Sequence, residues 1–352
     1  MKILATPVRD RDPAFVFSSQ GGQWLGMGRR LYDLEPVFQK SIESSDLEIG
    51  RYAGWSLIAE FSRNQRDYRL HDDPELIQPA LTALQIALGE LLRSYRIEPA
   101  AVAGLSMGEV AAAHCAGILS LADAFRIVCC QARLTTHQQR QGRMAFVNLD
   151  FARARSFVQE RNDGVAIAVE LNPEVSVLSG EAKAIERIVA DMQRRDIPCG
   201  IVPVGFAFHS PEVCVLQEEF LRLIGGVKPN PGEIPMYSAV AGDLKDGREL
   251  SVEHWWNIMS GPASFAGLVR SLLRDGHRIF VEVGPHPLLT DSIQKTALSA
   301  GLAVSTFGLM YRNHDDHAVF NETLQTLEAM QNQVELKQHN PTVKSLEGGT
   351  FR

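Results

Sequence analysis

Short apolar runs alternate with longer amphipathic stretches along most of this chain. The apolar runs are bounded by glycine, proline or polar residues, which is the pattern of buried strands. We expect strands over residues 14–17, 100–103, 236–240, 278–283 and 303–309. Between them, apolar residues recur at helical spacing, and we expect helices over residues 78–95, 119–136, 252–259, 262–275 and 313–332. Strands that alternate with helices indicate an open α/β sheet.

The pattern changes between residues 142 and 205, where strands and helices follow one another as β-α-β-β-α-β. This order is the split βαβ arrangement. Its second helix, over residues 182–195, places four apolar residues on one face, Ile185, Ile188, Val189 and Met192. We therefore expect a small subdomain over 142–205, inserted into a core formed by 13–141 and 206–330. A polar tail is expected over residues 331–352.

The composition is that of an ordinary globular protein. Hydrophobic residues make up 45% of the 352 residues and charged residues 22%, so the chain can bury a large core without disulfides. The formal net charge is −7 and no long basic run occurs, which argues against nucleic acid as a partner. No apolar run has the length of a membrane span or of a signal peptide. Five cysteines without a C-x-x-C pair indicate reduced thiols, and we expect a cytoplasmic protein.

One candidate for chemistry follows the strand expected at 100–103. The run Gly104-Leu-Ser-Met-Gly108 leads directly into helix-forming residues that begin at Glu109. A strand, a sharp turn and a helix with serine at the apex form a nucleophile elbow, G-x-S-x-G. The glycines let the backbone bend tightly, and Ser106 would then face a cleft. A chance Gly-Ser-Gly turn is the alternative interpretation.

A serine nucleophile needs a base at neutral pH, and histidine is the usual one. Most of the ten histidines lie in polar segments. His209 differs because it closes the run Phe206-Ala-Phe208 and precedes Ser-Pro. His286, within Gly-Pro-His-Pro, is the second candidate. Composition alone leaves both histidines open, together with a purely structural role for either.

Five segments, in order along the chain, resemble motifs of the acyltransferase family of polyketide and fatty acid synthases. They are Phe15-Val-Phe-Ser-Ser-Gln-Gly-Gly-Gln23, Ile77-Gln-Pro-Ala-Leu81, Gly104-Leu-Ser-Met-Gly108, Ala207-Phe-His-Ser-Pro211 and Val283-Gly-Pro-His-Pro287. The resemblance to this family, which has the malonyl-transacylase fold, extends from residue 15 to about 327. It implies an α/β-hydrolase-like core with an inserted ferredoxin-like subdomain, in agreement with the pattern at 142–205.

The resemblance implies ping-pong acyl transfer without a bound cofactor or metal. Ser106 would attack an acyl-CoA or acyl-phosphopantetheine thioester with His209 as base, and an acyl carrier protein thiol would accept the acyl group. Leu105 replaces the family's usual histidine before the serine, which changes the pocket but not the base. The oxyanion hole would be formed by the backbone N–H groups of Gln20 and Met107. A backbone carbonyl would orient the histidine, at Asn257 or Ile258.

A further departure concerns the cargo. Members that take malonyl groups carry an arginine on the helix after the elbow, and that position falls on Gln131. Glutamine has no charge, so it would stabilise a buried carboxylate poorly. We therefore predict a non-carboxylated acyl group, namely a starter, aminoacyl or growing chain, in a pocket lined by Phe206 and Phe208. An ordinary malonyl transacylase remains possible if Arg133 or Arg140 takes the place of the arginine.

Other functions with the same residues stay open. An acyl-carrier-protein hydrolase would release the acyl-serine to water, and a docking module would not use it at all. We expect a monomeric, free-standing enzyme whose partners are an acyl thioester and an acyl carrier protein. Carrier proteins are usually acidic, so basic residues near the cleft are candidates for that contact, namely Arg140, Arg143, Arg153 and Arg155.

Overall fold

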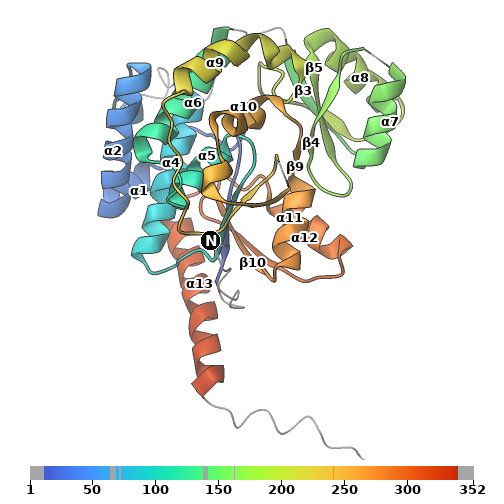
Figure 1. The fold of residues 1–352 in the computed structure, drawn as a ribbon. Coiled ribbons are helices and arrows are strands. Elements are labelled where there is room, and N and C mark those ends of the chain that lie inside the picture. The colour runs from blue at the N-terminus through green and yellow to red at the C-terminus, as the bar shows by residue number, and fades with distance from the viewer. Residues whose placement is uncertain are drawn as a thin grey trace, which may run out of the picture.

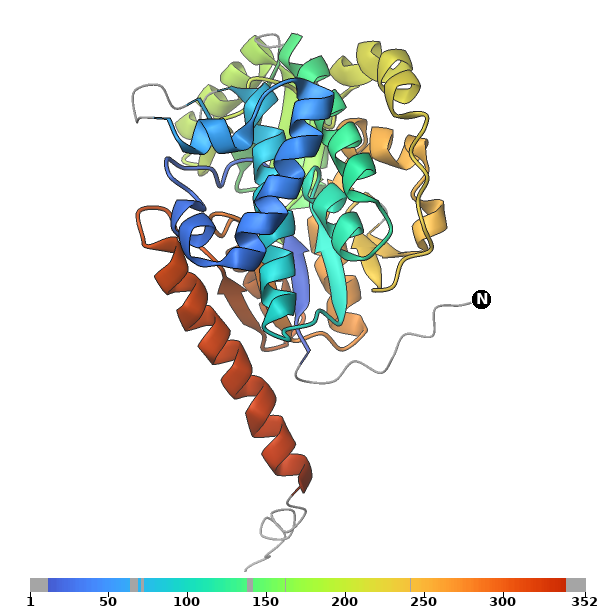
Figure 2. The same ribbon diagram turned by 90° about the vertical axis from the view of Figure 1, so that its left-hand side faces the viewer.

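The computed structural model describes residues 12–63, 69–70, 73–137, 142–161, 163–240 and 242–339. These residues form two β-sheets with helices packed around them (Figures 1 and 2). In Figure 1 the smaller sheet and its helices α7 and α8 lie at the upper right, and α1, α2, α4 and α6 lie on the other side of the body. The fold thus has the two-part organisation expected from the sequence, although the exact domain boundaries stay a prediction.

The larger sheet has six strands in the order β11-β10-β1-β2-β7-β8. All neighbours are parallel except β7 and β8, which pair antiparallel. The strands are β1 (Ala14–Phe17), β2 (Ala101–Gly104), β7 (Met236–Ser238), β8 (Asp243–Lys245), β10 (Ile279–Val283) and β11 (Ser305–Gly308). The first strand of the chain therefore lies in the middle of the sheet, beside the strand that leads into the elbow.

Alternation along β1 and β2 sends side chains to two separate cores. Phe15, Phe17 and Val102 pack among the helices of one face, whereas Val16 and Ala103 pack on the other face. The first face carries α1 (Arg29–Leu34), α2 (Pro36–Ala53), α4 (Pro74–Ser94), α5 (Gly108–Cys115) and α6 (Leu121–His137). The second face carries α11 (Phe265–Arg274) and α12 (Thr290–Ser299). Both faces of these strands are buried, which explains why their sequences are continuous apolar runs.

The smaller sheet has the order β6-β3-β5-β4-β9. Its strands are β3 (Gly142–Val147), β4 (Ala166–Glu170), β5 (Ser176–Glu181), β6 (Cys199–Val202) and β9 (Ala263–Ser264). One face packs on α7 (Phe151–Arg161) and α8 (Ala182–Arg194). The expected helix over 262–275 is shorter than predicted, because its first residues form β9 beside β4 and tie the small sheet to the core.

Several shorter elements connect these layers. They are α3 (Leu57–Phe61), the 3₁₀ helices η2 (Pro211–Leu216) and η3 (Gly247–Glu249), α9 (Gln217–Ile224) and α10 (Val252–Ser260). The last helix, α13 (Asp316–His339), continues past the expected end at 332 and projects from the body in Figure 2. The rest of the expected tail lies outside the described residues. No helix in the described ranges is both long and apolar enough to cross a bilayer.

Candidate active site

The elbow expected at residues 104–108 forms a sharp turn between β2 and α5. Ser106 lies at its apex with φ of 54°, in the left-handed region that non-glycine residues rarely adopt. Such a conformation costs about 1–3 kcal/mol and is concentrated at functional sites. The residue is buried but lines a pocket.

Both elbow glycines are required by close backbone contacts. A Cβ on Gly104 would lie 2.4 Å from the backbone nitrogen of Glu109, and a Cβ on Gly108 would lie 2.2 Å from the carbonyl oxygen of Phe17. The atoms in the way belong to the backbone and cannot rotate aside. The G-x-S-x-G spacing therefore follows from how closely β1, β2 and α5 approach one another around the serine.

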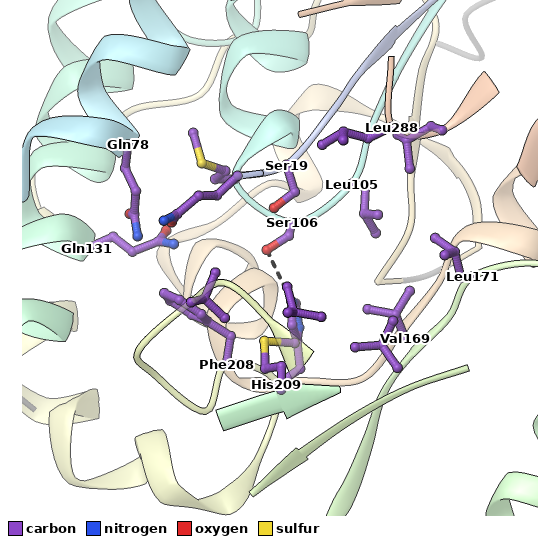
Figure 3. A pocket seen from close by; sticks show the side chains of 17 residues that line it. Ser19, Gln78, Leu105, Ser106, Gln131, Val169, Leu171, Phe208, His209 and Leu288 are labelled. Atoms are coloured by element: carbon purple, nitrogen blue, oxygen red, sulfur yellow. Dashed lines mark hydrogen bonds between the residues drawn. The ribbon is translucent and has the colours of Figure 1, made fainter. Parts of the chain in front are cut away.

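His209 lies against Ser106, although 103 residues separate them in the chain. Its Nε2 is 3.0 Å from the serine Oγ, a contact marked by the dashed line in Figure 3. Its Nδ1 is 2.7 Å from the carbonyl oxygen of Gly261. A carbonyl oxygen can only accept a hydrogen bond, so Nδ1 carries the ring proton and Nε2 presents its lone pair to the serine hydroxyl. This arrangement can remove the serine proton.

The prediction that Asn257 or Ile258 orients the histidine is wrong, because the carbonyl belongs to Gly261. The Asn257 carbonyl accepts the N–H of Gly261 at 2.8 Å, and Ile258 also lies within α10. Carbonyls at the end of a helix lack an intrahelical partner. Two of these carbonyls accept hydrogen bonds from His209. That of Gly261 accepts from Nδ1, and that of Met259 accepts from the backbone N–H at 2.8 Å.

The environment keeps the imidazole neutral. Burial lowers the pKa of His209 below its ordinary value, although the Gly261 carbonyl and the charge of Glu109 act in the opposite direction. Only a neutral imidazole can accept a proton, so the lowered pKa favours a base at neutral pH.

Glu109 is a buried residue near the site that the sequence did not single out. It lies in the first turn of α5 and is fully buried. Its Oε1 accepts the N–H of Ala239 at 2.9 Å, and its Oε2 lies 3.2 Å from Nε2 of His254 on α10. Glu109 therefore ties the elbow helix to the helix whose end orients His209.

Ser106 and His209 open onto a pocket of about 190 Å³. Most of its lining residues are apolar, and six of them come from the smaller sheet and the segments beside it, namely Met144, Val169, Leu171, Val177, Val202 and Val204. Val169 lies near the end of β4 and Val202 at the end of β6, and Leu171 and Val204 follow two residues later, just past each strand, so the spacing of extended backbone puts each pair on one side. Periodicity could predict these pairs, but not that they face the serine of another domain. Leu105 lines the same pocket, with Leu288 and Leu289.

The polar part of the lining consists of neutral side chains. Gln131 lines the pocket as expected, and Gln78 lies beside it in Figure 3. Gln78 belongs to the Ile77–Leu81 motif, so the signal for it was present although no role was assigned. Arg133 is exposed and is not part of the lining, whereas Arg140 lies outside the described residues.

Two further predictions concern the aromatic lining of the pocket and His286 as the alternative base. Phe208 lines the pocket, but Phe206 does not and packs edge to face on Phe208 with ring centroids 4.8 Å apart. The predicted lining role of Phe206 is therefore wrong, because its side chain is buried in the hydrophobic core on the helix-covered face of the large sheet. His286 accepts the N–H of Arg312 at its Nδ1 and stacks edge to face on Tyr311, so it is not the partner of the serine.

The predicted oxyanion donors lie at the same pocket. Gln20 and Met107 are both lining residues, and the described part of the chain offers no acceptor to either backbone N–H. Met107 directly precedes α5, so its N–H lies at the positive end of the helix dipole. Among the described residues, no cluster of His, Cys, Asp and Glu side chains is arranged to hold a metal ion.

The sequence matches a family model described as the acyl transferase domain over residues 14–340. A spectinabilin polyketide synthase system protein, NorA' of Streptomyces orinoci, is 38% identical over 282 residues, which are 80% of this chain and 8% of that protein. Erythronolide synthase EryA2 of Saccharopolyspora erythraea is 33% identical over 323 residues, 91% of this chain and 9% of that protein. The chain thus spans less than a tenth of the length of these two relatives.

Solved structures resemble the whole fold. The acyltransferase domain from module 8 of the salinomycin polyketide synthase has a TM-score of 0.86 and 32% identity, covering 90% of this chain and 74% of that one. A loading acyltransferase from the avermectin modular polyketide synthase has a TM-score of 0.85 and 33% identity, covering 90% and 99%. These similarities confirm the expected α/β-hydrolase-like core with a ferredoxin-like subdomain.

Proposed function

This chain belongs to the acyl transferase domain family, and we propose that it moves a non-carboxylated acyl group through an ester of Ser106 onto the phosphopantetheine thiol of an acyl carrier protein. The observation that carries this proposal is the hydrogen bond of 3.0 Å between Ser106 Oγ and His209 Nε2, at the mouth of an apolar pocket.

In the first half-reaction, His209 Nε2 takes the proton of Ser106 as the serine oxygen attacks the thioester carbonyl carbon. The carbonyl π electrons move to oxygen and form a tetrahedral oxyanion. Collapse of this intermediate breaks the carbon–sulfur bond, and the protonated His209 gives its proton to the leaving thiolate. The products are an acyl-serine ester and a free thiol.

The backbone N–H groups of Met107 and Gln20 would receive the oxyanion. Donors held in place before the reaction need no reorganisation as charge develops, and each is worth roughly 3–4 kcal/mol in the transition state. Gly261 supports the same step, because its carbonyl stabilises the imidazolium that forms when His209 is protonated.

The second half-reaction repeats these steps with the carrier-protein thiol as nucleophile. His209 removes the thiol proton, the new thioester forms, and Ser106 leaves with the proton returned.

The expected basic contact surface for the carrier is partly neutralised within the chain. Arg143 pairs with Glu186 at 3.1 Å and Arg153 with Asp150 at 3.4 Å, which leaves Arg155 exposed on α7.

Support for a neutral cargo comes from the pocket lining. The described lining residues include no lysine or arginine, and Gln131 holds the position where the family resemblance places the malonyl-binding arginine. A carboxylate in this pocket would lose its hydration without gaining an opposite charge.

Intact-protein mass spectrometry tests the proposal. Malonyl-CoA and short neutral acyl-CoAs are mixed with the protein, with and without an acyl carrier protein. We expect neutral acyl adducts that disappear in Ser106→Ala and that move to the carrier. Release of free acid instead of transfer would make the protein a hydrolase, and a stable malonyl adduct would refute the neutral cargo.

A further inference from the structure

Two buried amide side chains line the apolar pocket. Gln78 on α4 and Gln131 on α6 are 1% and 2% exposed. Oε1 of Gln78 is buried and has no hydrogen-bond donor in the described ranges. Figure 3 shows the two side chains converging on one side of Ser106, while Val169 and Leu171 lie on the opposite side. The pocket thus has a polar wall and an apolar wall.

A buried amide oxygen without a donor, as Oε1 of Gln78 is among the described residues, is unfavourable in a folded chain, because it loses its hydration without replacement. Gln85, two turns further along α4, also leaves its Oε1 without a donor among the described residues, but its Nε2 holds the fold together by donating to the carbonyl of Ser18 at 2.6 Å. Neither Gln78 nor Gln131 supports the fold in this way with its side-chain amide. Methionine or leucine would fill the same space without leaving a polar group unpaired.

We propose that Gln78 and Gln131 form a recognition site for a hydroxyl group on the acyl chain, so that the preferred substrates are hydroxyacyl thioesters. This inference rests on the proposed acyl transfer through Ser106. A hydroxyl both donates and accepts a hydrogen bond, so it can satisfy the acceptor of one amide and the donor of the other. Charged substituents fit less well, because the described lining offers them no opposite charge.

The substrate then lies with its two sides matched to the two walls. The carbonyl carbon is at Ser106, the hydroxyl points towards the glutamine pair, and the alkyl part contacts Val169 and Leu171. An acyl chain without the hydroxyl leaves Oε1 of Gln78 without a donor. Sites built to bind a hydroxyl discriminate strongly against analogues that lack it, so the hydroxyl should raise kcat/KM by about tenfold or more.

The test compares rates of Ser106 acylation by matched pantetheine thioesters, namely butyryl, 2-hydroxybutyryl and 3-hydroxybutyryl. We expect at least one hydroxyacyl thioester to be preferred over butyryl in the unaltered protein. Gln78→Met and Gln131→Met keep the side-chain length but remove the hydrogen bonds, and each should bring the ratio close to one. Leu171→Met, on the opposite wall, should leave the preference unchanged, and thermal melts check that all variants fold.

The outcomes separate this inference from the proposed function. Equal acylation by all three thioesters overturns the hydroxyl site and leaves acyl transfer standing. Absence of acylation by every thioester overturns the proposed function and the inference with it. A preference that persists in both glutamine variants, or that disappears equally in Leu171→Met, would assign selectivity to pocket shape and overturn the role of the amides.

Discussion

Replacing Gln131 with arginine should convert the neutral pocket into one that accepts malonyl groups. The side chain at this position is 2% exposed, so an introduced guanidinium would lose most of its water. It would also lack an acidic neighbour among the described lining residues. An unpaired buried charge destabilises a fold by about 3 kcal/mol or more. We therefore expect Gln131→Arg to melt several degrees below the unaltered protein.

A malonyl group would supply the missing partner. A guanidinium and a carboxylate can form two parallel N–H···O bonds, and a hydrogen bond to a charged group has a net worth of about 1.5–3 kcal/mol. If about 2 kcal/mol remains after desolvation, malonyl acylation of Ser106 should rise by about 30-fold relative to a neutral acyl group. Mass spectrometry of the acyl-enzyme measures the rate, and the melting temperature should recover when the malonyl ester forms.

Two control variants separate charge from shape. Gln131→Met has similar length without charge and should not gain malonyl loading. Gln131→Lys places a single point charge there and should gain less than arginine, because it cannot bind the carboxylate through two parallel bonds. If Gln131→Arg folds and shows no gain in malonyl acylation, then residue 131 does not decide the cargo and the reasoning is refuted.

Other predictions concern the catalytic pair and its supports. Burial lowers the pKa of His209 below 6.5, so the rate of acylation should rise with pH along an acidic limb whose midpoint lies below 6.5. A midpoint above 6.5 would contradict this. The fold favours the neutral form of His209, so this residue's contribution to the free energy of unfolding should be complete above pH 6.5 and lost as pH falls through the lower folded pKa. Urea unfolding of the unaltered protein and of His209→Gln at several pH values measures this contribution. The same pH dependence in both proteins would contradict the prediction. Glu109→Gln removes a charge that raises the pKa of His209, so the acidic limb of the acylation pH profile should move to lower pH. A limb that does not move would exclude electrostatic coupling between Glu109 and His209. Gly108→Ala places a Cβ 2.2 Å from the carbonyl oxygen of Phe17 and should lower the free energy of unfolding by about 3 kcal/mol or more. A Cβ at Gly205 would have no such neighbour within 4 Å, so Gly205→Ala should melt like the unaltered protein. Similar melting of the two variants would refute the steric argument.

The elbow and most secondary structure could be predicted from sequence, because their causes are local. The expected helix at 119–136 is α6 at Leu121–His137, and the insert has the predicted order of strands and helices. Strand β9 was missed, since two residues carry no periodicity and Ala263 pairs with a strand far away in the chain. The continuation of α13 to His339 was also missed, because polar residues with good helix propensity resemble a tail when no apolar stripe accompanies them.

By itself the sequence determined that a serine would stand on a sharp bend, because Gly104 and Gly108 flank it between an apolar run and a helix-forming run. It also carried the motif resemblance that selected His209. The tertiary structure decided which carbonyl orients that histidine, which walls enclose the serine and which amides face it. Every residue has a carbonyl, so no side-chain pattern could distinguish Gly261 from Asn257. Gln78 and Gln131 come from different helices, and only the packing of α4 against α6 brings their side chains together in one pocket.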